Sequence, residues 1–174
     1  RFARFGLELQ PMKTRLLEFG RLAADNRRRR GLGKPETFDF LGFTHICGKS
    51  PKGYFRIERQ TMRKRLRSKL KDIKSELKRR RHAPVPEQGA WLRSVLLGHY
   101  RYYGVPHNSR ALGVFRDQVI RYWRQALSRR SQKGWITRAR MTRIEQRWLP
   151  RPKICHPFPI NRFDVRIQGR SPVH

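Results

Sequence analysis

Residues 62–77 read MRKRLRSKLKDIKSEL, and this stretch decides the fold. Its apolar side chains recur every three or four positions, a spacing that places them on one face of a helix: Met62, Leu66, Leu70, Ile73 and Leu77. Pro84 and Pro86 then interrupt the pattern and end the helix. We therefore predict a basic amphipathic helix whose apolar face packs against other helices.

The same period predicts three further helices downstream. The second covers residues 87–103, and its expected buried side is Trp91, Leu92, Val95 and Leu96. The third opens with Asn108 or Ser109 as N-cap and is expected to bury Leu112, Phe115, Val119, Tyr122 and Ala126. The fourth is shorter, is capped by Thr137, and carries Met141, Ile144 and Trp148. Together these helices should form a small bundle.

Upstream of the helices the pattern is that of a β-hairpin. Residues 37–47 are rich in aromatic side chains and predict one strand. Residues 48–53 contain two glycines and a proline and predict a turn, after which residues 54–57 alternate as a returning strand.

The residues before the hairpin are compatible with more β-structure. Short apolar runs at 7–9 and 14–19 are separated by Pro11, which cannot sit in a central strand, and residues 21–30 are basic and compatible with a helix. The expected fold class is α+β, a small β-hairpin followed by a basic helical bundle. The expected divisions are residues 1–58, 59–149 and a proline-rich extended tail, 150–174.

Positive charge dominates the composition. The chain has 43 Lys and Arg against 12 Asp and Glu, a net charge of +31 at pH 7. Charge of one sign opposes compaction, and a polyanionic partner explains it best, because phosphates neutralised by Lys and Arg release counterions. No run of about 18 apolar residues occurs, so a membrane partner is not expected.

The cysteines indicate a reducing compartment. Cys47 and Cys155 lie far apart, and no charged-then-apolar leader is recognised, so a cytoplasmic location is expected. His45 and His156 stand near these cysteines without the spacing of a tetrahedral zinc site, so no metal is expected. The first residue is Arg1 instead of Met, and we expect the chain to be a fragment or a truncated form of a longer reading frame.

Three parts of the sequence resemble one protein family. Residues 7–14, LELQPMKT, and residues 38–43, FDFLGF, resemble the sixth and seventh sequence blocks of group II intron-encoded reverse transcriptases, also called maturases. Residues 98–105, GHYRYYGV, preceded by Trp91 and Leu92 and followed by residues 115–123, resemble the maturase-specific thumb, domain X. The order and spacing of these parts carry the resemblance, which covers nearly the whole chain.

The resemblance implies a role in splicing and intron mobility. The first part would be the end of a polymerase palm, with a primer grip that includes Phe40, Leu41, Gly42 and Phe43. The thumb helices would bind the group II intron RNA, promote its splicing, and clamp the template-primer duplex. In a full-length parent, an RNA-directed DNA polymerase that uses Mg²⁺, Lys13 would be a general acid toward pyrophosphate, or else a surface lysine at the start of a strand.

The chain departs from the family where catalysis is concerned. The family's polymerase chemistry needs a Tyr-x-Asp-Asp turn and a further aspartate that hold two metal ions. No two acidic residues of this chain are adjacent or separated by one position. We therefore expect the chain alone to be inactive, to hold no metal and to need no cofactor.

The strongest binding signal is on the first predicted helix. At about 100° per residue, five cations form a stripe beside the apolar face: Arg63, Arg67, Lys71, Lys74 and Lys78. Asp72 and Glu76 fall on the opposite flank with Arg65 and Lys69. A solvated face normally mixes signs, so the stripe favours phosphate binding.

Further RNA contacts are expected outside the stripe. The basic segment contributes Arg27, Arg28, Arg29 and Arg30, and the second helix contributes Arg101. Tyr100 and Tyr103 are expected to be packed, leaving at most one tyrosine of this run for RNA.

On the third helix, Asp117 lies among Arg110, Arg121 and Arg124, which predicts an internal salt-bridge network.

Two other functional classes stay open. One is a free-standing RNA-binding splicing factor, and the other is a structural basic protein of ribosomal type, for which the charge alone would suffice. The primer-grip-like block argues against the ribosomal class, because a structural binder has no need of it.

Overall fold

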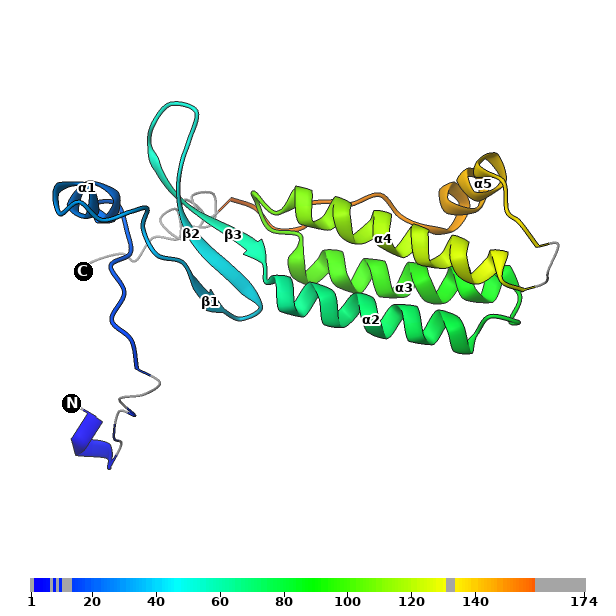
Figure 1. Ribbon diagram of the computed structural model, residues 1–174, viewed down its shortest axis with the longest axis horizontal. Coiled ribbons are helices and arrows are strands. Elements are labelled where there is room, and N and C mark those ends of the chain that lie inside the picture. The colour runs from blue at the N-terminus through cyan, green and yellow to red at the C-terminus, as the bar shows by residue number, and fades with distance from the viewer. Residues whose placement is uncertain (1, 7, 9, 11–13, 131–133, 159–174) are drawn as a thin grey trace, which may run out of the picture. The chain divides into compact units, whose positions relative to one another are not determined.

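The computed structural model describes the whole chain except residues 1, 7, 9, 11–13, 131–133 and 159–174 (Figure 1). The described residues form an α+β fold with a three-stranded antiparallel sheet in the order β1-β2-β3. The chain divides into two units, Arg1–Phe38 with His45–Ile57, and Asp39–Thr44 with Glu58–His174. We refer to them as the N-terminal and the helical unit.

The predicted hairpin is confirmed by β2 (Phe43–Lys49) and β3 (Phe55–Thr61). The Ser50 N–H donates to the Tyr54 carbonyl at 2.8 Å and closes the turn, while Gly53 adopts a φ of 81° that favours glycine. The return strand extends to Thr61, four residues beyond the predicted end.

The single strand predicted for residues 37–47 is wrong. It breaks into β1 (Phe38–Phe40) and β2, because Leu41 and Gly42 have φ values of 48° and 79° and reverse the chain. Two successive residues with positive φ are typical of a tight two-residue hairpin turn. The Thr44 hydroxyl donates to an Asp39 carboxylate oxygen at 2.6 Å across this turn.

The segment before the sheet is less regular than predicted. Residues 14–19 form no strand. Leu16 is fully exposed, while Leu17 and Phe19 are partly buried and the Phe19 ring lies 4.8 Å from that of Phe38. The run at 7–9 includes residues outside the described part of the chain. The basic segment does form a helix, α1 (Ala23–Arg29), and a short 3-10 helix, η1, covers Phe2–Phe5.

Four helices build the described part of the helical unit: α2 (Arg63–Arg79), α3 (Val85–Tyr103), α4 (Ser109–Ser128) and α5 (Arg138–Trp148). Figure 1 shows α2, α3 and α4 side by side. Leu70, Ile73 and Leu77 of α2 are buried, as predicted. Helix α3 begins two residues earlier than expected, because Pro86 falls in the first turn, where its missing N–H costs nothing.

The buried side of α4 differs from the prediction. Leu112, Phe115 and Val119 are buried as expected, but the next buried residues are Trp123 and Leu127, while Tyr122 and Ala126 are only partly buried. On α3, Leu92 and Leu96 are fully buried, whereas Trp91 and Val95 are partly buried. A fully buried indole needs an acceptor for its N–H, and Trp123 donates to the Gln88 Oε1 atom at 2.8 Å.

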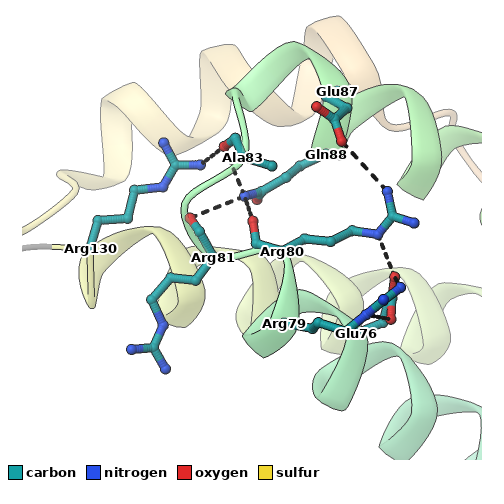
Figure 2. A network of polar contacts seen from close by, with 8 residues as sticks. All are labelled: Glu76, Arg79, Arg80, Arg81, Ala83, Glu87, Gln88 and Arg130. Carbon is teal, nitrogen blue, oxygen red and sulfur yellow. Dashed lines mark hydrogen bonds and ion pairs between the residues drawn. The ribbon is translucent and has the colours of Figure 1, made fainter.

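Gln88 also joins α3 to the end of α2 (Figure 2). Its Nε2 atom lies 2.5, 3.3 and 3.2 Å from the carbonyl oxygens of Arg80, Arg81 and Ala83. These carbonyls follow the last turn of α2, and the amide shares them with other donors, since the Arg80 carbonyl also accepts from the Ala83 N–H at 3.0 Å. Arg130 adds a second donor to the Ala83 carbonyl at 2.6 Å.

Asn108 stands at the predicted N-cap of α4, but its side chain does not cap the helix. It is buried, and its Oδ1 accepts from the Thr61 N–H at 3.0 Å, while its Nδ2 donates to Thr61 Oγ1 and the Tyr103 carbonyl, both at 2.8 Å. The side chain therefore links the end of β3 to the end of α3. The predicted cap of α5 is confirmed, since Thr137 Oγ1 accepts from the Arg140 N–H.

The described part of the tail, residues 149–158, forms no helix or strand. The Pro150 carbonyl accepts from Tyr100 Oη at 3.3 Å and from Arg116 Nε at 3.2 Å. The N–H groups of Cys155 and His156 donate to the Gly104 carbonyl at 2.7 and 3.0 Å. These contacts fasten the tail to α3 and α4.

Substitutions at two glycines of α3 should have opposite effects on stability. Gly89 is buried, and a Cβ built on it would lie 2.5 Å from the Trp148 ring of α5, whereas a Cβ on Gly98 would meet nothing within 4 Å. Gly89→Ala should lower the unfolding free energy by about 1 to 3 kcal/mol, because the overpacked contact moves α5. Gly98→Ala should be neutral or raise it by up to ~1 kcal/mol, because alanine favours a helix. Denaturant unfolding of both variants checks this, and equal effects would contradict the packing of α5 on α3.

The histidine of α3 predicts a pH dependence. His99 is buried with its ring 3.7 Å from that of Phe115, and within the described residues its Nε2 has no hydrogen-bond partner. Burial, with a smaller contribution from Lys69, lowers its pKa from 6.5 to about 4. Between these two values the unfolded chain binds more protons than the folded chain, so stability falls as pH falls from 6.5 toward 4.

The expected loss across this window is about 1 to 2 kcal/mol, allowing for solvent screening. His99→Phe keeps an aromatic ring against Phe115 and removes the titrating group, so its stability should change less over the same pH range. Denaturant titrations at constant ionic strength measure both profiles. Identical slopes for the two proteins would show that His99 does not titrate as its burial implies.

Candidate nucleic-acid interface

Helix α2 presents a basic face along its whole length. We define the basic face by the predicted stripe, all five members of which are exposed: Arg63, Arg67, Lys71, Lys74 and Lys78. Among the described residues, none of the five forms an ion pair within 4 Å. The face spans 15 residue steps, or about 22 Å at 1.5 Å per residue.

The acidic flank of α2 is smaller than the sequence suggests. Glu76 accepts hydrogen bonds from Arg79 at 2.8 and 2.7 Å and a further bond from Arg80 (Figure 2). These guanidinium groups lower the pKa of the Glu76 carboxyl to about 2. Arg80 also lies 3.7 Å from Glu87. The helix therefore neutralises Glu76 with its own last turn and leaves the basic face without an opposing charge from this carboxylate.

A groove lies between α2 and α4 beside the basic face. This α2/α4 groove has a volume of about 170 Å³ and is lined by Lys74, Ser75, Leu77, Lys78, Arg81, Tyr122, Gln125, Ala126 and Arg129. The Lys74 ammonium lies 5.5 Å from the centre of the Tyr122 ring. Cations from α2 and from the segments that follow α2 and α4 thus surround a partly apolar floor. Sequence reasoning missed Arg81, Tyr122 and Arg129, since only the packing of α2 on α4 brings them beside the stripe.

The other flank of α2 borders a different groove, about 440 Å³ in volume, toward α3. Arg65 and Lys69 line it together with Asp72, Ser68, Ser94 and Tyr102. The carboxylate of Asp72 among these cations mixes the charge. This flank therefore offers a weaker attraction for phosphate than the basic face does.

Tyr100 and Tyr103 of α3 are packed as predicted. Tyr100 is buried, which raises its pKa to about 12, and Tyr103 is partly buried. Tyr102 is 52% exposed, although its hydroxyl donates to the Leu41 carbonyl at 2.9 Å. Arg101 is exposed, so its guanidinium is available to a ligand, and its backbone carbonyl lies 2.6 Å from the His156 Nε2 atom.

The four primer-grip-like residues divide into two kinds. Phe40 and Leu41 are 59% and 68% exposed at the turn between β1 and β2. Gly42 is enclosed, since a Cβ there would lie 3.0 Å from the Tyr103 hydroxyl. Phe43 is buried, with its ring 5.2 Å from that of Tyr103. Only Phe40 and Leu41 can therefore reach a ligand directly.

The arginines predicted at positions 27–30 fall into two groups, paired and available. Arg27 donates to the Gly33 carbonyl at 3.1 Å and lies 3.5 Å from Glu36, and Arg30 pairs with Glu18. Arg28 and Arg29 are exposed. These two are the members of the predicted set that remain available for phosphate.

The remaining expectations concern catalysis, metals and membranes. Lys13, the candidate general acid, lies outside the described residues. Within the described part of the chain, no three His, Cys, Asp or Glu side chains gather as a metal site would require. None of the described helices is long and apolar enough to span a bilayer.

Comparison with known proteins gives no relative: the chain matches no protein-family model, no curated protein and no solved structure. The support for a function therefore comes from the chemistry of the basic face, from the groove beside it, and from the sequence blocks quoted above.

Proposed function

We propose that this chain binds RNA through the basic face of α2 and the adjoining α2/α4 groove. The observation that carries the proposal is the exposed row of five cations with no ion-pair partner among the described residues. Glu76, a carboxylate of the same helix, is bound by Arg79 and Arg80 instead. A folded protein gains little from such a row in water, whereas a polyanion releases counterions when it binds.

The geometry of the face suits a nucleic-acid backbone. Its length of about 22 Å allows contact with several successive phosphates. Lys74 and Lys78 continue from the face into the groove, where the Tyr122 ring offers an apolar surface beside them. Phosphate contacts of this kind position a nucleic acid without reading its sequence.

For a full-length parent protein, the activity that we propose is that of a group II intron reverse transcriptase and maturase. In this reading the hairpin of β2 and β3 is the end of a palm, the turn at Phe40 and Leu41 is a primer-grip-like contact, and α2 to α5 form the thumb. The helices would assist splicing of the intron RNA and hold the template-primer duplex. The sequence blocks at 7–14, 38–43 and 98–105 support this assignment.

A free-standing RNA-binding protein or splicing factor is the second candidate. It is favoured by the fact that α2, α4 and their groove lie wholly within the helical unit. The two candidates differ at Phe40 and Leu41. A crosslinker placed at Leu41 should capture the 3′ end of a primer in the first case and should capture none in the second.

The RNA-binding proposal predicts a localised loss of affinity. Changing Lys71, Lys74 and Lys78 to Gln should weaken binding to a structured RNA, because the neutral side chains no longer displace counterions from the phosphates. The slope of log K against log salt should flatten by about 0.7 to 0.9 for each phosphate that is no longer neutralised. Filter binding over a range of salt concentrations measures both quantities.

The matched control removes the same charge from another helix. Arg138, Arg140 and Arg143 are exposed on α5 and form no ion pair among the described residues. Changing these three to Gln should leave the slope closer to that of the unmodified protein. Equal losses from the two sets would mean that RNA binds through diffuse charge, and the proposed interface would be wrong.

A further inference from the structure

One aromatic side chain of the helical unit is exposed without an evident structural reason. Trp135 lies between α4 and α5 with 76% of its surface exposed. The residues after it are anchored, since Ile136 is buried, its N–H lies 3.5 Å from Ser128 Oγ, and Thr137 caps α5. The backbone is therefore held while the indole, a large apolar surface, faces solvent.

The surroundings of Trp135 are strongly basic. The guanidinium carbon of Arg124 lies 5.4 Å from the centre of the indole ring, within the range of a cation–π contact. The ring borders a groove of about 500 Å³, the Trp135 groove, lined by Arg121, Arg124, Gln125, Ser128, Arg129 and Trp135. No carboxylate is among the residues that line it.

The salt-bridge network predicted for this face of α4 is absent from the described residues. Asp117 is exposed and forms no ion pair within 4 Å, so it does not neutralise Arg121 or Arg124. The prediction assumed that charges three or four positions apart would pair, but Arg124 lies over Trp135 instead. The arginines around the indole thus keep their charge for a ligand.

The two grooves share residues. Gln125 and Arg129 line both the α2/α4 groove and the Trp135 groove. An RNA strand whose phosphates bind in the α2/α4 groove can therefore continue past Arg129 into the Trp135 groove. An exposed indole beside a planar guanidinium is the surface on which an unpaired nucleobase stacks, and arginines beside it suit the flanking phosphates.

We infer that the Trp135 groove binds an unpaired base of RNA, which stacks on the indole, with Arg121 and Arg129 holding the adjoining phosphates. This inference rests on the proposed RNA-binding function and adds to it a single-strand specificity that the basic face of α2 cannot supply. Phosphate contacts alone would not distinguish a duplex from a single strand, whereas stacking requires a base that is not already paired.

The test uses the full chain and two RNA probes, a single-stranded 12-nucleotide oligomer and a 12-base-pair duplex. Trp135→Ala should weaken binding of the single strand by about 5- to 150-fold and leave duplex binding within twofold, because stacking on an aromatic side chain contributes about that much per base. Trp135→Phe should restore most of the affinity. Tyr54→Ala, which removes another exposed aromatic ring, this one in the N-terminal unit, is the control and should change neither probe.

The outcomes separate this inference from the proposed function. In one outcome, Trp135→Ala leaves single-strand binding unchanged, while binding of both probes still depends on Lys74 and Lys78. This result would overturn the stacking site alone. Failure of both probes to bind the unmodified chain would overturn the RNA-binding function as well. Binding to anionic phosphatidylglycerol vesicles that depends on Trp135, with no such dependence for RNA, would replace the base with a membrane surface and overturn the inference.

Discussion

The helical unit depends on one buried amide. Gln88 receives the Trp123 N–H on its oxygen and directs its nitrogen to the carbonyls at the end of α2, so a single side chain ties three helices together. Removing it would leave the indole N–H and the Arg81 carbonyl without these partners, at a cost of about 1 to 3 kcal/mol for each buried group left unsatisfied. The Arg80 and Ala83 carbonyls would keep the Ala83 N–H and the Arg130 guanidinium as donors. The end of α2 is therefore held against α3 by hydrogen bonds as well as by apolar packing.

The end of α2 also has an electrostatic role. Arg79 and Arg80 lie three and four positions after Glu76, so the helix itself brings them close enough to neutralise this carboxylate. The apolar face of α2 is occupied by α4 and the rest of the core, which leaves the basic face outward. The contacts that close the core therefore also decide which charges remain exposed.

Local signals in the sequence predicted the elements well. The period of α2, the Thr137 cap and the turn of the β2–β3 hairpin depend on residues close together in the chain, and all three are confirmed. Features that need a distant partner were missed. Gln88 is polar, and only the Trp123 indole and the end of α2 explain its burial. The prediction likewise placed Tyr122 in the core instead of its neighbour Trp123. The break at Leu41 was hidden because an aliphatic residue with positive φ is rare.

The sequence predicted only part of the candidate site. The members of the basic face follow from helical spacing alone, but Arg81, Tyr122 and Arg129 join it only through packing. The most direct test of the interface compares two sides of α2 on one molecule, by measuring lysine acetylation with and without a bound structured RNA. The account predicts strong protection of Lys74 and Lys78 and little change at Lys69, which lines the opposite groove. Equal protection of all three lysines, or greater protection of Lys69, would contradict it.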